Sequence, residues 1–93
     1  MPADERKRAH VRVRGRVQGV FFRGEMRERA RSRRVAGWVR NDPDGTVEAI
    51  LEGPAEAVES VLAWCGRGPA GAEVADVEVV WETPDDEQSF SVR

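Results

Sequence analysis

The spacing of hydrophobic residues changes along the chain and predicts its first strand and helix. Residues 10–14 alternate polar and apolar side chains, which predicts a strand with its valines facing inward. Over residues 22–34, apolar side chains recur every four positions between mostly charged ones, at Phe22, Met26 and Ala30. This spacing predicts an amphipathic helix. A loop with two glycines, Gly15 and Gly19, lies between these two elements.

A hairpin and a second helix follow. Residues 36–41 and 46–52 are the predicted arms of the hairpin, and residues 42–45, Asp-Pro-Asp-Gly, form its turn. Pro54 is predicted to occupy the first position of the second helix, which Gly66 ends. The residues expected on the inward face of this helix are Val58, Val61, Leu62 and Cys65.

The remaining pattern completes the fold prediction. A loop containing Gly68 and Pro69 leads to a strand over residues 77–81, and a short strand at residues 90–92 ends the chain. The order βαββαβ plus a final strand predicts an α+β fold, the ferredoxin-like α/β sandwich, in which two helices cover one face of an antiparallel sheet. We expect one domain over residues 8–93 and a flexible tail over residues 1–7.

Composition narrows the class of protein. The chain has 93 residues, of which 40% are hydrophobic and 34% charged, as in a soluble globular domain. No apolar run approaches the roughly 20 residues of a membrane span, and the charged N-terminus does not resemble a secretory signal. One cysteine allows no internal disulfide, which favours the reducing cytoplasm. At this size we expect a monomer with no membrane partner.

The charge is unevenly distributed. Residues 1–40 carry 13 Lys and Arg against 4 acidic residues, whereas residues 41–93 carry 2 against 13. A basic half raises the question of nucleic acid binding. However, one folded domain would bring the two halves together, and the outward positions of the first strand, His10, Arg12 and Arg14, offer no aromatic ring for base stacking. We therefore expect no nucleic acid partner.

Most residues capable of chemistry have a structural interpretation. His10 is the only histidine, so neither a His-Cys metal site nor a Ser-His-acid triad is expected. Cys65 lies on the apolar face of its helix, which favours a buried, inert thiol. The three tryptophans, Trp38, Trp64 and Trp81, are expected to bury area against the sheet or to cap its edges.

Two features point to an anion site, and each has a simpler alternative. The loop from Gly15 to Arg23 lies between a strand and a helix, where converging backbone N–H groups and a guanidinium can hold phosphate oxygens. The alternative is a plain strand–helix connection with a surface arginine. Asn41 ends a strand before the turn, and the alternative is that its side chain caps that turn.

Together these segments resemble the acylphosphatase family. The first family motif is matched at every fixed position by Val13, Arg14, Gly15, Arg16, Val17, Gln18, Gly19, Val20, Phe21, Phe22 and Arg23. The second is matched by Gly37, Trp38, Asn41, Gly45, Val47 and Gly53. The resemblance covers residue 9 to Arg93. One departure is that Arg33 and Arg34 stand where the family usually has an apolar residue and often a glycine.

The resemblance implies an enzyme that hydrolyses the carboxyl-phosphate bond of acyl phosphates by in-line attack of water. It implies that Arg23 binds the phosphate, that Asn41 orients the water, and that the loop at residues 15–21 holds the phosphoryl oxygens through its backbone amides. Inorganic phosphate is then the product and a competitor. Because no metal ligands cluster and no nucleophile is evident, we expect no metal, no other cofactor and no covalent intermediate.

Other interpretations stay open from the sequence. Acylphosphatase-like domains also occur within larger enzymes that handle carbamoyl phosphate, although a single domain favours the free-standing enzyme. A non-catalytic ferredoxin-like module that binds an anion or RNA is the alternative from a different class. The motifs specify a phosphoryl group and leave the acyl group undefined.

Overall fold

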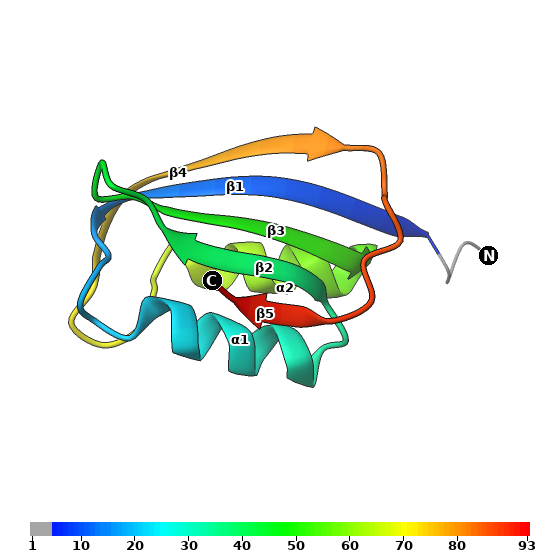
Figure 1. Ribbon diagram of the computed structural model, residues 1–93, viewed down its shortest axis with the longest axis horizontal. Helices are drawn as coiled ribbons and strands as arrows, with labels where there is room; N and C mark the ends of the chain where they lie inside the picture. The colour runs from blue at the N-terminus through cyan, green and yellow to red at the C-terminus, as the bar shows by residue number, and fades with distance from the viewer. Residues whose placement is uncertain (1–4) are drawn as a thin grey trace.

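The computed structural model describes residues 5–93 as one five-stranded sheet with two helices packed on one of its faces (Figure 1). The order of the strands across the sheet is β4-β1-β3-β2-β5. In chain order the elements are β1 (Arg6–Arg16), α1 (Phe22–Ser32), β2 (Ala36–Asn41), β3 (Val47–Pro54), α2 (Ala55–Cys65), β4 (Glu73–Glu82) and β5 (Phe90–Val92). The predicted βαββαβ order and the placement of both helices on one face are confirmed.

The final strand changes the character of the sheet. β4, β1, β3 and β2 pair antiparallel as predicted, but β5 pairs parallel to β2, with Gly37 opposite Phe90 and Val39 opposite Val92. The sheet is therefore mixed, and the prediction of an antiparallel sheet was wrong for its last strand. The physical reason is the connection after β4, which crosses to the opposite edge and reverses, so that β5 runs in the direction of β2 (Figure 1).

The core lies between the sheet and the helices. Alternating residues of β1 and β3 face the helices, as their period of two predicts. α1 contributes the apolar positions predicted from its four-residue spacing, and Cys65 of α2 is fully buried. Burial raises the pKa of the Cys65 thiol to about 12, so the thiol is inert as expected. The core residues are Ala9, Val11, Val13, Val17, Phe22, Met26, Ala30, Val35, Val39, Val47, Ala49, Leu51, Val58, Val61, Trp64, Cys65 and Phe90.

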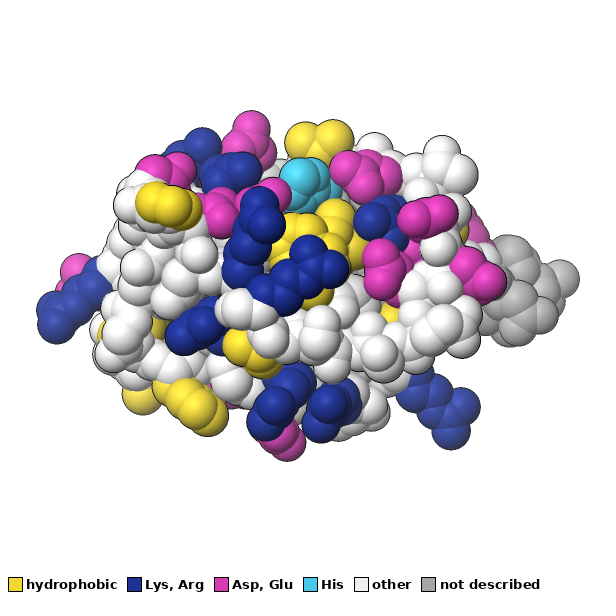
Figure 2. All heavy atoms as spheres, viewed as in Figure 1, with side chains coloured by type: hydrophobic (Ala, Val, Ile, Leu, Met, Phe, Trp, Pro, Cys, Tyr) yellow, Lys and Arg dark blue, Asp and Glu magenta, His cyan; other side chains and the backbone are white. Residues whose placement is uncertain are grey.

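The opposite face of the sheet is covered by paired charges. Glu48 and Glu52 of β3 are 5% and 0% exposed, because arginines on the neighbouring strands lie over them. In the strand register, Arg12 and Arg40 flank Glu48 while Arg8 stands opposite Glu52. Basic and acidic side chains accordingly intermingle on the surface seen in Figure 2. The basic and acidic halves of the sequence thus meet across the sheet.

Several boundaries differ from the sequence prediction. Arg6 and Lys7 belong to β1, where they pair with Pro54 and Gly53, so the strand starts before residue 8. Glu5 is also held, since its carbonyl accepts a hydrogen bond from Ala55 N at 3.0 Å. Residues 1–4 of the expected tail lie outside the described residues. Pro54 is the last residue of β3 and caps α2 instead of occupying its first turn. Its fixed φ of −55° suits the extended conformation it adopts there.

The end of α1 shows how the two unusual arginines are accommodated. The helix stops at Ser32, and Arg33 follows as its C-terminal cap. Arg34 adopts a left-handed conformation with φ 60°, which a glycine adopts at lower cost. Both side chains are exposed, and Val35 fills the core at this end of the helix.

The three tryptophans have different surroundings. Trp64 is buried against Phe22, with ring centroids 5.0 Å apart. Leu62, which was expected to face inward, is partly buried and packs against the core. Trp38 lies on the outer face of β2 beneath the guanidinium groups of Arg40 and Arg93. Trp81, on the edge strand β4, is 51% exposed.

Candidate active site

The topology brings Arg23 and Asn41 to the same end of the sheet. β1 and β2 run in the same direction, since each is antiparallel to β3 between them. The carboxyl ends of parallel strands share one edge. Arg23 lies in the first turn of the helix that follows β1, and Asn41 is the last residue of β2. Two residues 18 positions apart in the sequence therefore lie at the same end of the fold.

A surface hollow of about 410 Å³ lies at this end. It is open to solvent and is bordered by the loop after β1, the first turns of α1, the end of β2 and the end of β5. The residues that line it are Val17, Gly19, Phe21, Phe22, Arg23, Gly24, Arg27, Asn41 and Val92.

The backbone amides beside the hollow are free. Among the described residues, none accepts a hydrogen bond from the N–H groups of residues 17–24, and the first such bond in α1 runs from Glu25 N to Phe21 O at 3.1 Å. Phe21 precedes the helix in a left-handed conformation with φ 64°, and no side chain caps the helix start. Unpaired N–H groups at a helix N-terminus bind anions.

Arg23 is held in place by the end of the chain. Its Nη1 donates to the backbone carbonyl of Arg93 at 3.1 Å, while Arg93 N donates to Val39 O at 2.8 Å. A guanidinium carries five N–H donors. Among the described residues this is the only hydrogen bond from Arg23, so the remaining donors can meet a ligand in the hollow.

Asn41 presents a carbonyl without a partner. Its Oδ1 is buried and accepts no hydrogen bond from the described residues. The turn after it is closed by other groups: Gly45 N donates to Asp42 O at 3.1 Å, and Thr46 N donates to Asp44 Oδ1 at 3.0 Å. Asn41 therefore does not cap the turn, which was the simpler explanation for an asparagine at this position.

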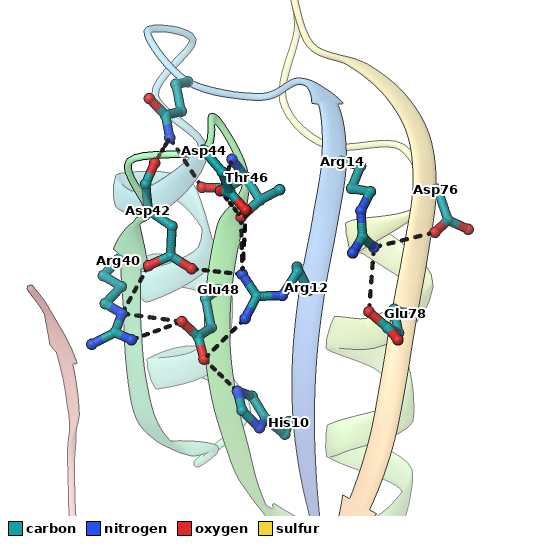
Figure 3. A network of polar contacts seen from close by, with 11 residues as sticks. His10, Arg12, Arg14, Arg40, Asp42, Asp44, Thr46, Glu48, Asp76 and Glu78 are labelled. Atoms are coloured by element: carbon teal, nitrogen blue, oxygen red, sulfur yellow. Dashed lines mark hydrogen bonds and ion pairs between the residues drawn. The ribbon is translucent and has the colours of Figure 1, made fainter.

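A polar network fixes the turn that follows Asn41 (Figure 3). The Asp42 carboxylate accepts from Arg12 Nη1 at 2.8 Å and from Arg40 Nε at 3.0 Å. The Glu48 carboxylate accepts from Arg40 and pairs with His10. Burial raises the pKa of the Glu48 carboxyl, but hydrogen bonds from His10 and Arg40 outweigh burial and lower the pKa to about 2.

The comparisons with known proteins agree with this geometry. A family model described as Acylphosphatase matches residues 9–92. The chain belongs to the acylphosphatase family. It is 53% identical over 88 residues to an acylphosphatase of Thermococcus kodakarensis, covering 95% of this chain and 97% of that protein.

Solved acylphosphatase structures share the whole fold. The acylphosphatase from Coxiella burnetii superposes with a TM-score of 0.92 at 34% identity, covering 100% of both chains. The one from Bacillus subtilis gives a TM-score of 0.90 at 35% identity, covering 94% of this chain and 98% of that chain. The mixed sheet with its short final strand is thus part of the fold of this acylphosphatase-family chain.

The residues of the first acylphosphatase motif divide into two groups. Val17, Gly19, Phe21, Phe22 and Arg23 line the hollow. The other members of the predicted loop support it. Gly15 and Arg16 belong to β1; the register shifts between Arg14 and Gly15, and a Cβ at Gly15 would collide with the carbonyl of Glu73. Val20 packs against the core.

Gln18 connects the loop to the turn after Asn41. Its Nε2 donates to Asp42 O at 2.8 Å and to Thr46 O at 3.0 Å. The side chain thus connects the two segments of the acylphosphatase motifs. Gln18 does not line the hollow, whereas its neighbours Val17 and Gly19 do.

Four residues that line the hollow are absent from the predicted site: Phe22, Gly24, Arg27 and Val92. Arg27 follows Arg23 by four positions, and this helical spacing could have placed it on the same side of α1. Val92 reaches the hollow because β5 lies parallel beside β2, for which the sequence carries no local signal.

Two further observations concern other classes of site. Within residues 5–93, no three His, Cys, Asp or Glu side chains are grouped so that they could hold a metal ion. Over the same residues, neither helix is long and apolar enough to cross a membrane.

Proposed function

We propose that this protein hydrolyses acyl phosphates to a carboxylate and inorganic phosphate. The observation that carries the proposal is the pairing of two kinds of unsatisfied group across one hollow. The free N–H groups of residues 17–24 and the guanidinium of Arg23 are donors for a phosphoryl group. The buried Oδ1 of Asn41 is an acceptor for a water molecule.

The phosphoryl group is bound by the donors. Its oxygens accept hydrogen bonds from the loop amides and from Arg23, which offsets negative charge before and during bond cleavage. These donors are fixed by the fold, because the Arg93 carbonyl holds Arg23 and the sheet holds the loop. Little reorganisation is then needed during the reaction.

The attacking water is positioned by Asn41. Its Oδ1 accepts a hydrogen bond from the water and directs the oxygen lone pair at phosphorus, in line with the leaving carboxylate. The P–O bond to the acyl group breaks as the new P–O bond forms, and the water proton passes to the phosphate product and solvent. A carboxylate leaves without protonation, so this route needs no strong acid and no covalent intermediate.

The substrate and location complete the proposal. The partner is a small acyl phosphate, and inorganic phosphate competes for the same donors. We also propose that the protein acts as a cytoplasmic monomer, without metal, other cofactor or nucleic acid, since amides and a guanidinium provide the positive charge.

The test is phosphate release from butyryl phosphate by the purified protein in the presence of EDTA. We expect turnover that EDTA leaves unchanged and that inorganic phosphate inhibits competitively. Activity that disappears with EDTA and returns with a divalent cation would contradict the mechanism. Binding of phosphate without turnover would instead identify a non-catalytic anion-binding module.

The same protein can be titrated with phosphate while its amide resonances are followed. Shifts should concentrate at residues 17–24, with α2 as the internal control. Shifts confined to positions away from this loop would rule out the loop as the phosphate site.

A further inference from the structure

A second arginine lines the hollow one helical turn beyond Arg23. Arg27 lies four positions further along α1, so the two side chains project from the same face of the helix. At 1.5 Å per residue, their Cα atoms are about 6 Å apart along the helix axis. The phosphoryl group of the proposed reaction requires only the first of these cations.

Arg27 is less completely paired than the next arginine of α1. Its Nε is buried and has no partner among the described residues. Its one ion pair in the same residues is loose, with Nη2 3.9 Å from Oε2 of Glu28, a side chain that is 70% exposed. Arg29 instead donates from Nε and Nη2 to Glu25 and stacks on Trp64.

Arg27 donates no hydrogen bond to another described residue, and its side chain is 41% exposed, so its terminal Nη groups can donate to a ligand. Because these donors are part of a guanidinium, an anionic acceptor such as a carboxylate or phosphate fits best. The guanidinium of Arg27 therefore marks a second anion position at the border of the same hollow.

Apolar side chains line the same hollow as the two arginines. The Phe21 ring is 72% exposed and lies against Gly24, where any Cβ would collide with the ring. Val92 borders the same hollow. A short methylene chain can lie along these side chains while charged groups at its two ends meet Arg23 and Arg27.

We propose that Arg27 is a specificity-determining residue that selects acyl phosphates whose acyl group ends in a second anionic group. The inference rests on the proposed function, because it takes the phosphoryl group to lie at Arg23 and the loop amides. An acyl chain with two methylenes spans a length comparable to the separation of the two arginines on the helix. The substrate class is then a dicarboxylic or phosphorylated acyl phosphate.

The experiment compares two substrates of matched length. Succinyl phosphate ends in a carboxylate and butyryl phosphate ends in a methyl group. We expect kcat/KM to favour succinyl phosphate by about tenfold, the order expected for one hydrogen-bonded charge pair. Arg27→Gln should abolish most of this preference, and Arg27→Lys should keep part of it. A phosphonate-terminated acyl phosphate of the same length tests whether a phosphate can replace the carboxylate.

Arg31→Gln is the matched control. It removes the same charge from the same helix one turn later, where the side chain is exposed and lies outside the hollow. The control should leave the substrate preference unchanged. If it reduced the preference as much as Arg27→Gln does, the preference would arise from the overall positive charge of the helix. The proposal would then be overturned.

Two further outcomes distinguish this inference from the proposed function. If both substrates are hydrolysed and Arg27→Gln leaves the kcat/KM ratio unchanged, hydrolysis stands and the role of Arg27 is refuted. The affinities of succinyl and butyryl phosphonate, which contain no carboxyl-phosphate bond, provide a readout independent of turnover. Suppose that the protein shows no turnover but binds succinyl phosphonate more tightly, and that this preference depends on Arg27. The role of Arg27 in selectivity would then stand, and the proposed hydrolysis would be refuted.

Discussion

The outer face of the sheet and the hollow beside α1 treat polar groups in opposite ways. On the outer face, the buried carboxylate of Glu48 is surrounded by His10, Arg12 and Arg40. In the hollow, the Asn41 carbonyl and the N–H groups of residues 17–24 have no partners among the described residues. β2 contributes to both regions, through Arg40 on the outer face and Asn41 in the hollow.

The difference separates stability from binding capacity. Paired groups have already made their interactions, so their loss destabilises the folded state. Unpaired groups raise the free energy of the folded state, and a ligand lowers it by completing their hydrogen bonds. The network around Asp42 joins the two regions, because Asp42 directly follows Asn41 and is held by Arg12 and Arg40.

The largest effect should come from removing Arg23, the cation of the hollow that we propose binds the phosphoryl group. We expect Arg23→Ala to lower kcat/KM about 10²–10³-fold, because a fixed donor to the phosphoryl group is lost. Affinity for inorganic phosphate should fall as well, since the ground state carries the same charge. Steady-state kinetics and phosphate inhibition measure both effects.

The matched control for Arg23 is Arg67→Ala, which removes an exposed arginine from the loop after α2. It should retain both activity and phosphate affinity. Wild-type kinetics in Arg23→Ala would show that the guanidinium serves only to bind the Arg93 carbonyl.

Asn41→Ala should produce a somewhat smaller loss with a different signature. We expect kcat to fall about 100-fold, in the range for one positioned polar group, with little change in phosphate inhibition. The melting temperature should hardly move, because Asn41 Oδ1 accepts no hydrogen bond within the described residues.

Asp42, the residue after Asn41, should show the opposite pattern. Asp42→Ala removes the acceptor of Arg12 and Arg40 and should lower the melting temperature clearly. If Asn41→Ala turned over substrate at the wild-type rate, the proposed role of Asn41 in positioning the water would be refuted.

Acid should weaken the paired region through Glu48. Its pKa is lowered from 4.5 to about 2 in the folded protein, so the folded state favours the charged carboxylate. This stabilisation is present above pH 4.5 and is lost as the pH falls toward 2; it amounts to about 3 kcal/mol. In urea unfolding at several pH values, Glu48→Gln should have a lower free energy of unfolding than the wild type. This difference should become smaller as the pH falls.

The control for Glu48 is Glu73→Gln, an exposed carboxylate of β4 that makes no ion pair with another described residue. The free energy of unfolding of this variant should differ little from that of the wild type, and the difference should not depend on pH. A Glu48→Gln deficit that is independent of pH would mean that the loss arises from packing and not from the charge.

The smallest effect concerns a position outside both regions. Arg34→Gly should stabilise the protein by about 0.5–1 kcal/mol, because glycine adopts the positive φ without the cost borne by a residue with a Cβ. Arg33→Gly, at φ −112°, offers no such relief and should destabilise slightly. Thermal unfolding of both variants tests the comparison, and equal effects would contradict it.

The sequence predicted features that depend on local pattern. The period of two in β1 and the four-residue spacing of α1 identify the core side of each element. The glycine loop and the strand end identified Arg23 and Asn41 as candidates, and parallel β1 and β2 explain why these residues meet. Arg27 could have been placed by the same helical spacing as Arg23.

Other features depend on contacts between distant segments. β5 is three residues long and follows an irregular segment, so nothing local indicates that it joins β2 in parallel. The burial of Glu48 and Glu52 follows from the strand register, which sets arginines beside them; polar residues in an alternating pattern otherwise predict a solvated face. Lys7 entered β1 for the same reason, since its partner Gly53 is distant in sequence.

The position of β1 between β3 and β4 has a consequence for how fast the chain folds. Arg8 at one end of β1 pairs with Glu82, 74 residues later. β1 can therefore pair with β4 only after residues near position 82 are available. Closing so long a loop costs entropy before any contact repays it. Proteins dominated by such distant pairings fold in about milliseconds to seconds, whereas helical bundles fold in microseconds to milliseconds. During synthesis, β1 and β3 can pair early, but the strand on the far side of β1 is supplied only when most of the chain has emerged.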